Sequence, residues 1–220
     1  MNNRRNRFVR IAVVAALVSL ALLGTGCLGV FQEITAGPAG RMQTRVRFTM
    51  SKAMIESLNE MGGEPMDTDE VFDPADGPVD PNAIPGLVDV VVEKVDNPVD
   101  VGMAFRGTLS RLPSGTRPED APFIPFDEGN GFVIALPPLG EDDEPSDPQS
   151  EQFAAMFFAS TKYQLVLDKA LYPTISSAEV EVAGGRSPAL VSELPGSWLV
   201  EFPISTWFNA AEGCRLVVER

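Results

Sequence analysis

The alternation of apolar and polar residues over residues 42–50 is the feature that most restricts how this chain folds. The segment reads MQTRVRFTM, and a period of two residues is typical of a strand with one buried face and one solvated face. The apolar residues are Met42, Val46, Phe48 and Met50, and the opposite face carries Gln43, Arg45 and Arg47. This pattern predicts a half-buried strand in an antiparallel sheet.

Short apolar or alternating runs predict that strands dominate the rest of the chain as well. We expect further strands at residues 31–35, 87–95, 101–111, 131–137, 162–168, 178–183, 197–202 and 214–219. Apolar residues at helical spacing predict one helix over 52–61, capped by Ser51, and a second over about 150–160, while residues 204–211 suit a helical turn. The expected fold class is α+β, a mainly antiparallel sheet with two short helices packed on it.

Acidic, proline-rich segments interrupt these expected elements. Residues 64–86 hold seven acidic residues and five prolines, residues 139–150 hold five and two, and neither segment has a basic residue. Such segments bury too little apolar surface to offset the entropy of ordering them, so we expect exposed loops there and in the proline-rich stretch 113–130. The whole chain has a net charge of −14, which argues against a nucleic-acid partner because phosphates are bound by clustered Lys and Arg.

The N-terminal residues have a different pattern. Residues 4–10 hold four arginines and no acidic residue, and residues 11–24 are uncharged and mostly apolar. A basic segment followed by an apolar one of this length is typical of a secretory signal, whereas a membrane-spanning helix needs about 20 apolar residues. Residues 23–27, Leu-Gly-Thr-Gly-Cys, resemble the lipobox of bacterial lipoproteins. We therefore expect a signal peptide over 1–26 and a single exported domain over 27–220.

The lipobox resemblance implies a lipid anchor at Cys27. In such lipoproteins the thiol receives a diacylglyceryl group, the chain is cut before the cysteine, and the new amino terminus is usually acylated, with palmitate as the expected fatty acid. Two or more acyl chains hold a protein stably on a membrane. In enterobacterial lipoproteins an Asp after the cysteine retains the protein at the inner membrane, and this chain has Leu28. The expected location is extracytoplasmic, at the periplasmic face of the outer membrane if the source has two membranes. The alternative is ordinary cleavage nearby that leaves Cys27 free.

Removal of the signal peptide changes both the cysteine count and the charge. It removes four arginines and no acidic residue, so the net charge of the exported part becomes −18. If Cys27 is a thioether, Cys214 remains as a single thiol at the entrance of the last expected strand. We expect that thiol to be buried and inert, because the chain has no His to act as its base.

Three runs in the second half form a further pattern: LYPTISSAEV (171–180), WLVEFPI (198–204) and RLV (215–217). They resemble the C-terminal part of LppM-like bacterial lipoproteins, which have a Pro-Ile/Val-x-Ser/Ala stretch, a variable turn, an apolar strand ending in proline and a final strand. The resemblance implies an envelope protein whose exported domain is mostly sheet and has been linked to glycolipid binding. This chain departs from the pattern because it lacks the Asn-Gly turn and carries the acidic loops. No residue role is transferred from the family.

The residue types also restrict the chemistry. The absence of His excludes His-based triads and the commonest metal ligand, and the sequence has no nucleophile elbow, Ser-x-x-Lys motif, P-loop or Rossmann fingerprint. We expect no enzymatic activity, no cofactor and no metal site. The alternative of a calcium site in the acidic segment fails the EF-hand spacing; its candidate ligands are Asp67, Asp69, Glu70, Asp73, Asp76 and Asp80.

Methionine and phenylalanine at helical spacing are the candidate ligand-binding feature. Packed against a sheet, such side chains would line an apolar groove for an acyl chain or a partner's apolar segment. The candidate groove residues are Met54, Leu58, Met61, Phe153, Met156 and Phe157. The alternative is ordinary core packing. For Arg45 and Arg47 the interpretations are a solvated face or a contact with an anionic headgroup.

The function expected from the sequence is that of a lipid-anchored envelope lipoprotein with a non-catalytic binding or assembly role. Its expected partners are the membrane, through lipidated Cys27, and a lipid or protein of the envelope. The alternatives are a lipid or glycolipid carrier with a Met/Phe-lined pocket and an extracytoplasmic hydrolase.

Overall fold

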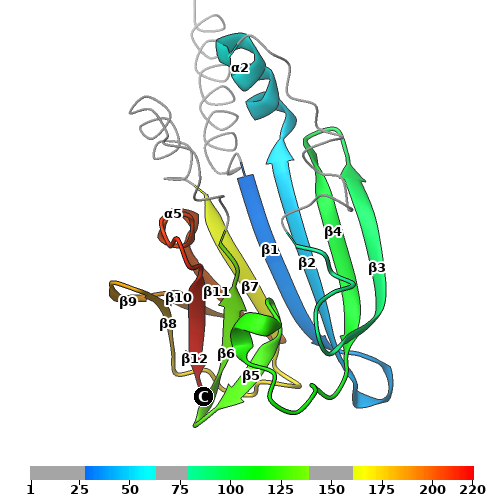
Figure 1. Ribbon diagram of the computed structural model, residues 1–220, viewed down its shortest axis with the longest axis vertical. Helices are drawn as coiled ribbons and strands as arrows, with labels where there is room; N and C mark the ends of the chain where they lie inside the picture. Colours follow the sequence, from blue (N-terminus) through cyan, green and yellow to red (C-terminus); the bar gives the residue numbers. More distant parts are fainter. Residues whose placement is uncertain (1–27, 63–78, 139–160) are drawn as a thin grey trace, which may run out of the picture.

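Two β-sheets that face each other make up most of the described structure (Figure 1). The computed structural model describes residues 28–62, 79–138 and 161–220. Most of these residues lie in strands, most strand pairs are antiparallel, and two α-helices are present among them. The chain is therefore sheet-dominated, as expected.

The larger sheet has seven strands and contains the one parallel strand pair of the described ladders, β1 with β7. Its strands, in spatial order, are β10 (Leu190–Leu194), β11 (Ser197–Pro203), β7 (Lys162–Asp168), β1 (Leu28–Ala36), β2 (Met42–Ser51), β4 (Asp100–Leu109) and β3 (Leu87–Asp96). The first strands in the chain, β1 and β2, are joined by a tight turn over η1 (Pro38–Gly40) and lie at the centre of the sheet.

The smaller sheet has five strands and is antiparallel throughout. In spatial order these are β5 (Pro125–Glu128), β6 (Gly131–Leu136), β12 (Cys214–Glu219), β8 (Ser177–Val182) and β9 (Gly185–Pro188). The 3-10 helix η2 (Pro118–Asp120) precedes β5, and α5 (Ile204–Phe208) connects β11 toward β12. The smaller sheet covers the half of the larger sheet that contains β11, β7 and β1 (Figure 1).

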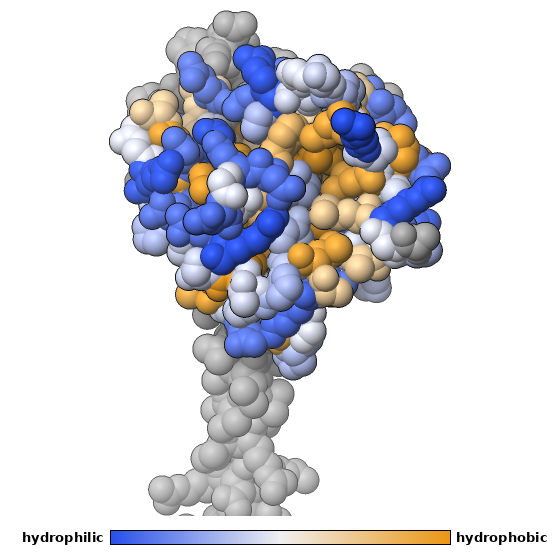
Figure 2. Space-filling view, turned by 90° about the horizontal axis from the view of Figure 1, so that it is seen from below, coloured by the Kyte–Doolittle hydropathy of each residue, from blue (hydrophilic) through white to orange (hydrophobic). Residues whose placement is uncertain are grey.

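Apolar side chains from both sheets fill the space between them. Seen from below, apolar residues gather between two hydrophilic regions of the surface (Figure 2). The period-two pattern of β2 is reproduced, because Val46 and Phe48 are buried while Gln43 and Arg45 are exposed. An aromatic cluster lies at the centre, with ring centroids 5.0–6.1 Å apart, and consists of Phe48, Phe105, Phe123, Tyr163, Phe202 and Trp207. Aromatic contacts of this kind stabilise a core beyond the area they bury.

A glutamine lies within this core and is fully hydrogen-bonded. The side-chain amide of Gln32 donates to the Phe123 carbonyl oxygen at 2.7 Å and to the Thr44 hydroxyl at 3.2 Å, and its carbonyl accepts from the Tyr163 hydroxyl. Phe123 has φ = 64°, which is costly for a bulky residue. The Gln32 amide therefore satisfies a buried carbonyl at a strained position.

All the strands and the first helix expected from the sequence are present. The helix expected at 52–61 is α2 (Lys52–Gly62), and the expected helical turn is α5. The helix expected at about 150–160 lies outside the described residues. The structure also contains β5, β9 and β10, which were not expected, and β5 lies in the stretch 113–130 that was predicted to be a loop.

The position of α2 differs from the expected packing on a sheet. Because β2 ends at Ser51 and α2 begins at Lys52 without an intervening turn, the helix continues past the end of the sheet (Figure 1). Ile55 is buried, and the Ser51 hydroxyl accepts a hydrogen bond from the Met54 amide at 3.3 Å, as expected of a cap. Over residues 28–62, 79–138 and 161–220, no helix is long and apolar enough to cross a membrane.

Candidate functional site

The structure places only part of the Met/Phe site that was predicted from the sequence. Met54 lies half-buried on α2, and Leu58 and Met61 belong to the same helix, although their side chains lie outside what the structure describes. Cys27, Phe153, Met156 and Phe157 also lie outside the described residues, as do the calcium candidates Asp67, Asp69, Glu70, Asp73 and Asp76. The apolar groove and the lipid anchor stay predictions.

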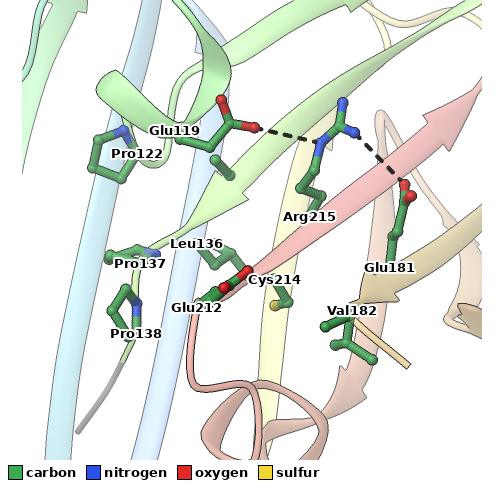
Figure 3. A pocket seen from close by; sticks show the side chains of 13 residues that line it. Glu119, Pro122, Leu136, Pro137, Pro138, Glu181, Val182, Glu212, Cys214 and Arg215 are labelled. Atoms are coloured by element: carbon green, nitrogen blue, oxygen red, sulfur yellow. Dashed lines mark ion pairs between the residues drawn. The ribbon is translucent and has the colours of Figure 1, made fainter. Parts of the chain in front are cut away.

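A hollow of about 360 Å³ opens on the smaller sheet where β6 ends and β12 begins (Figure 3). We call it the Arg215 hollow. Its volume falls in the range of about 300–1,000 Å³ that is usual for ligand pockets. Four separate parts of the chain line it, namely η2 with the loop after it, the end of β6, the end of β8, and the start of β12: Glu119, Pro122, Ala135–Pro138, Glu181–Ala183 and Glu212–Arg215.

One side of the Arg215 hollow is apolar and fixed in place. Pro122, Pro137 and Pro138 form a wall opposite Val182 (Figure 3). The indole nitrogen of Trp207 donates a hydrogen bond to the Pro137 carbonyl oxygen and so ties this wall to the core. Gly213 has φ = 78°, and a Cβ there would meet the Leu136 carbonyl oxygen, so the bend into β12 requires glycine.

The rim of the Arg215 hollow is charged and mainly acidic. The Arg215 guanidinium lies 2.9 Å from the Glu128 carboxylate, 3.7 Å from that of Glu181 and 4.0 Å from that of Glu119. Figure 3 shows it between Glu119 and Glu181, with Glu212 nearer the apolar wall. Three carboxylates are therefore paired with the Arg215 guanidinium, and that of Glu181 is also paired with Arg186 at 3.4 Å. Together with Glu212, the carboxylates at the hollow outnumber the guanidinium groups, and this excess of negative charge favours cationic ligands.

The thiol of Cys214 lies beside the hollow but is not activated. Cys214 is buried, as expected from the sequence, and burial raises the pKa of its thiol to about 12. At neutral pH the group is a neutral thiol, and the thiolate is the form that acts as a nucleophile or metal ligand. Among the described residues, no group of three or more Cys, Asp or Glu side chains is arranged to hold a metal ion.

A second hollow, of about 420 Å³, lies on the outer face of the larger sheet. Arg45 of β2 and Arg106 of β4 face each other across the strands, and the Glu93 carboxylate bridges them at 3.7 Å and 3.6 Å. Asp89 also lines this hollow and has φ = 55° at an irregularity of the β3–β4 ladder. Arg45 is exposed, as the strand pattern predicted, whereas Arg47 is half-buried.

Sequence reasoning did not find the Arg215 hollow. Its acidic residues come from η2, β5, β8 and the turn before β12, and each of them alone reads as a solvated surface residue. The pairing of β12 with both β6 and β8 brings them together, since Arg215 is opposite Ala135 on one side and Glu181 on the other.

Comparisons with models of known protein families, with curated proteins and with solved structures found no match to this chain.

Proposed function

We propose that this protein is an exported, lipid-anchored protein that acts by non-catalytic binding, and that its ligand occupies the Arg215 hollow. The lipobox resemblance at residues 23–27 supports the anchor. The observation that carries the binding role is the form of the hollow, in which an apolar wall lies beside an acidic rim on an already packed sheet. Pockets of this composition, mostly apolar with a few converging polar groups, are the usual sites of ligand binding.

The chemistry of the hollow selects a ligand that is both apolar and cationic. The proline wall would contact an aliphatic or aromatic group, while the carboxylates of Glu119, Glu181 and Glu212 would pair with a positive charge beside it. A Lys or Arg side chain next to an apolar residue, presented by a partner protein, has this combination. The net charge of −18 on the exported part would favour encounter with a basic partner.

The packing of the core supports surface binding over an internal lipid-carrier site. In the described structure the space between the sheets contains the aromatic cluster and the Gln32 network, and Phe105, Phe123, Tyr163 and Trp207 are at most 1% exposed. An acyl chain would have to displace these side chains, which would leave the Gln32 hydrogen bonds unmade.

Charge-changing substitutions test this assignment by the sign of their effects. We expect Glu212→Gln and Glu181→Gln each to weaken binding of an acetylated Trp-Lys dipeptide amide about two- to five-fold, because a partly exposed ion pair contributes up to about 1 kcal/mol. Arg215→Gln is expected to strengthen binding, because it removes the cation that is paired with two of the proposed ligand-binding carboxylates, those of Glu119 and Glu181. Titration calorimetry on the detergent-solubilised protein measures the dissociation constants.

The control for these variants is Glu56→Gln, which makes the same charge change at an exposed residue of α2, a helix that is not among the elements lining the hollow. It should leave the affinity unchanged, and the Trp-Glu dipeptide amide should bind more weakly than Trp-Lys to the unmodified protein. Equal affinity for the two dipeptides, stronger binding by Glu212→Gln, or weaker binding by Arg215→Gln would contradict a cationic ligand at this hollow.

A further inference from the structure

We infer that the end of the larger sheet where β1 begins faces the bilayer surface, with the β3–β4 turn and α2, which continues past this end, directed toward the lipid headgroups. The inference rests on the proposed lipid anchor at Cys27 and adds to it the orientation of the domain. Its basis is the connection between that residue and the fold.

No linker separates the lipidated residue from the sheet. β1 begins at Leu28, the residue directly after Cys27, and Leu28 is already paired with Met50 in the β1–β2 ladder. Consecutive Cα atoms are about 3.8 Å apart. A diacylglyceryl group on the Cys27 thiol would therefore hold the end of a central strand within one residue of the membrane surface.

The elements at this end are fixed by strand register. Met50 is paired with Val101, so the end of β2 and the start of β4 lie level with Leu28. The Lys52 amide donates a hydrogen bond to the Val99 carbonyl oxygen at 2.8 Å, and the Lys52 ammonium lies 2.5 Å from the Asp96 carboxylate. The start of α2 and the β3–β4 turn are thus held together at the end of the sheet where β1 begins, at the top of Figure 1.

The side chains there suit an interface between water and lipid. Val99 is 54% exposed at the tip of the β3–β4 turn. Contact of this turn with the bilayer would bury the apolar surface of Val99 among the headgroups. The side chains of Lys52 and Lys162 are partly exposed at this end, where their ammonium groups are ion-paired with Asp96 and Glu201. These side chains are long enough to bring their ammonium groups to lipid phosphates as well. The bilayer surface is therefore the occupant that these side chains and the anchor indicate together.

The opposite end of the sheet would face away from the membrane. β1 has nine residues, which at about 3.4 Å per residue separate its two ends by about 27 Å. The turn between β1 and β2, with the exposed residue Arg41, lies at that far end. This separation is large enough to measure with lipid-borne quenchers.

The test places an environment-sensitive fluorophore at either end of the lipidated protein. The variants Val99→Cys and Arg41→Cys are each made in a Cys214→Ser background, purified from membranes and labelled with NBD at the new cysteine. Each labelled protein is then reconstituted in phosphatidylcholine–phosphatidylglycerol vesicles that contain spin-labelled lipid. We expect the label at position 99 to be quenched at least three-fold more strongly than the label at position 41. A ten-residue Gly/Ser insertion between Cys27 and Leu28 should remove most of this difference.

A third label, at Val91→Cys on the outer face of the larger sheet, identifies the other orientation. Quenching at position 91 equal to or stronger than at position 99 would mean that the sheet lies flat on the bilayer, and would overturn the inference, as would equal quenching at 99 and 41. Failure of the unlabelled protein to float with the vesicles would instead contradict the anchor itself, and the inference with it.

Discussion

The Cys27→Ala protein is expected to lose about 4 kcal/mol of its free energy of unfolding between pH 9 and pH 12 because of ionisation of Cys214 alone. Urea unfolding measures this loss. Burial raises the pKa of this thiol from 9.0 to about 12. Below pH 9 the thiol is protonated in both states and its contribution is fully present. As the pH rises, the unfolded chain ionises first, so stability falls by about 1.4 kcal/mol per pH unit until the folded state also ionises near pH 12.

Tyr172 adds to this loss at slightly higher pH, because burial raises its pKa from 10.0 to about 12. The measurement is a series of urea titrations from pH 7 to pH 12, with Cys214→Ala as the matched variant. Above pH 9, the free energy of unfolding of Cys214→Ala should fall less steeply with pH than that of the parent. The expected difference in slope is about 1.4 kcal/mol per pH unit, which corresponds to one proton released on unfolding. Parallel curves for the two proteins would show that the Cys214 thiol is not buried as described.

Trp207→Ala is expected to lower the free energy of unfolding by about 3–5 kcal/mol, the usual cost of truncating a large buried aromatic residue. Trp207 is fully buried in α5, and its ring lies 6.1 Å from that of Phe123 and 5.9 Å from that of Tyr163. The substitution also removes the hydrogen bond to the Pro137 carbonyl oxygen, so the wall of the Arg215 hollow loses its connection to the core.

Phe208→Ala is the control for the tryptophan substitution, because Phe208 is the next residue of the same helix and is 37% exposed. It should cost about 1–2 kcal/mol, less than the tryptophan substitution, since about a third of the Phe208 surface is already in water. Both values come from urea midpoints at pH 7 with the slopes compared. A Trp207→Ala cost that is no larger than the Phe208→Ala cost would contradict the packed aromatic core.

The strands were predictable because their burial is periodic within each segment. Residues 42–50 and 162–168 alternate so regularly that the bounds of β2 and β7 follow from the pattern to within one residue. By contrast β9, with the sequence GRSP, has no such alternation, and it is a strand because it pairs with the edge of β8. The number of sheets and the parallel β1–β7 pair depend on contacts between distant segments, which local patterns do not encode.

The candidate site was less predictable for the same reason. Gly213, Cys214 and Arg215 were visible at the start of a strand, but the acidic partners of Arg215 at positions 119, 128 and 181 are separated from it along the chain and carry no shared motif. The Met/Phe residues were chosen for their helical spacing, which does not distinguish a groove from a core. Of the predicted positions, the structure describes the side chain of Met54.

The central claim, that this acidic sheet domain is held on a membrane through Cys27, is tested most directly by the mass of the mature N-terminal peptide. Protein isolated from membranes is digested, and the N-terminal peptide is fragmented in the mass spectrometer, with Cys27→Ala as the control. We predict an N-terminal residue Cys27 that carries a thioether-linked diacylglyceryl group and an amide-linked fatty acid, and no such peptide from the control. An N-terminus at another residue, or an unmodified Cys27 within a longer peptide, would contradict the account.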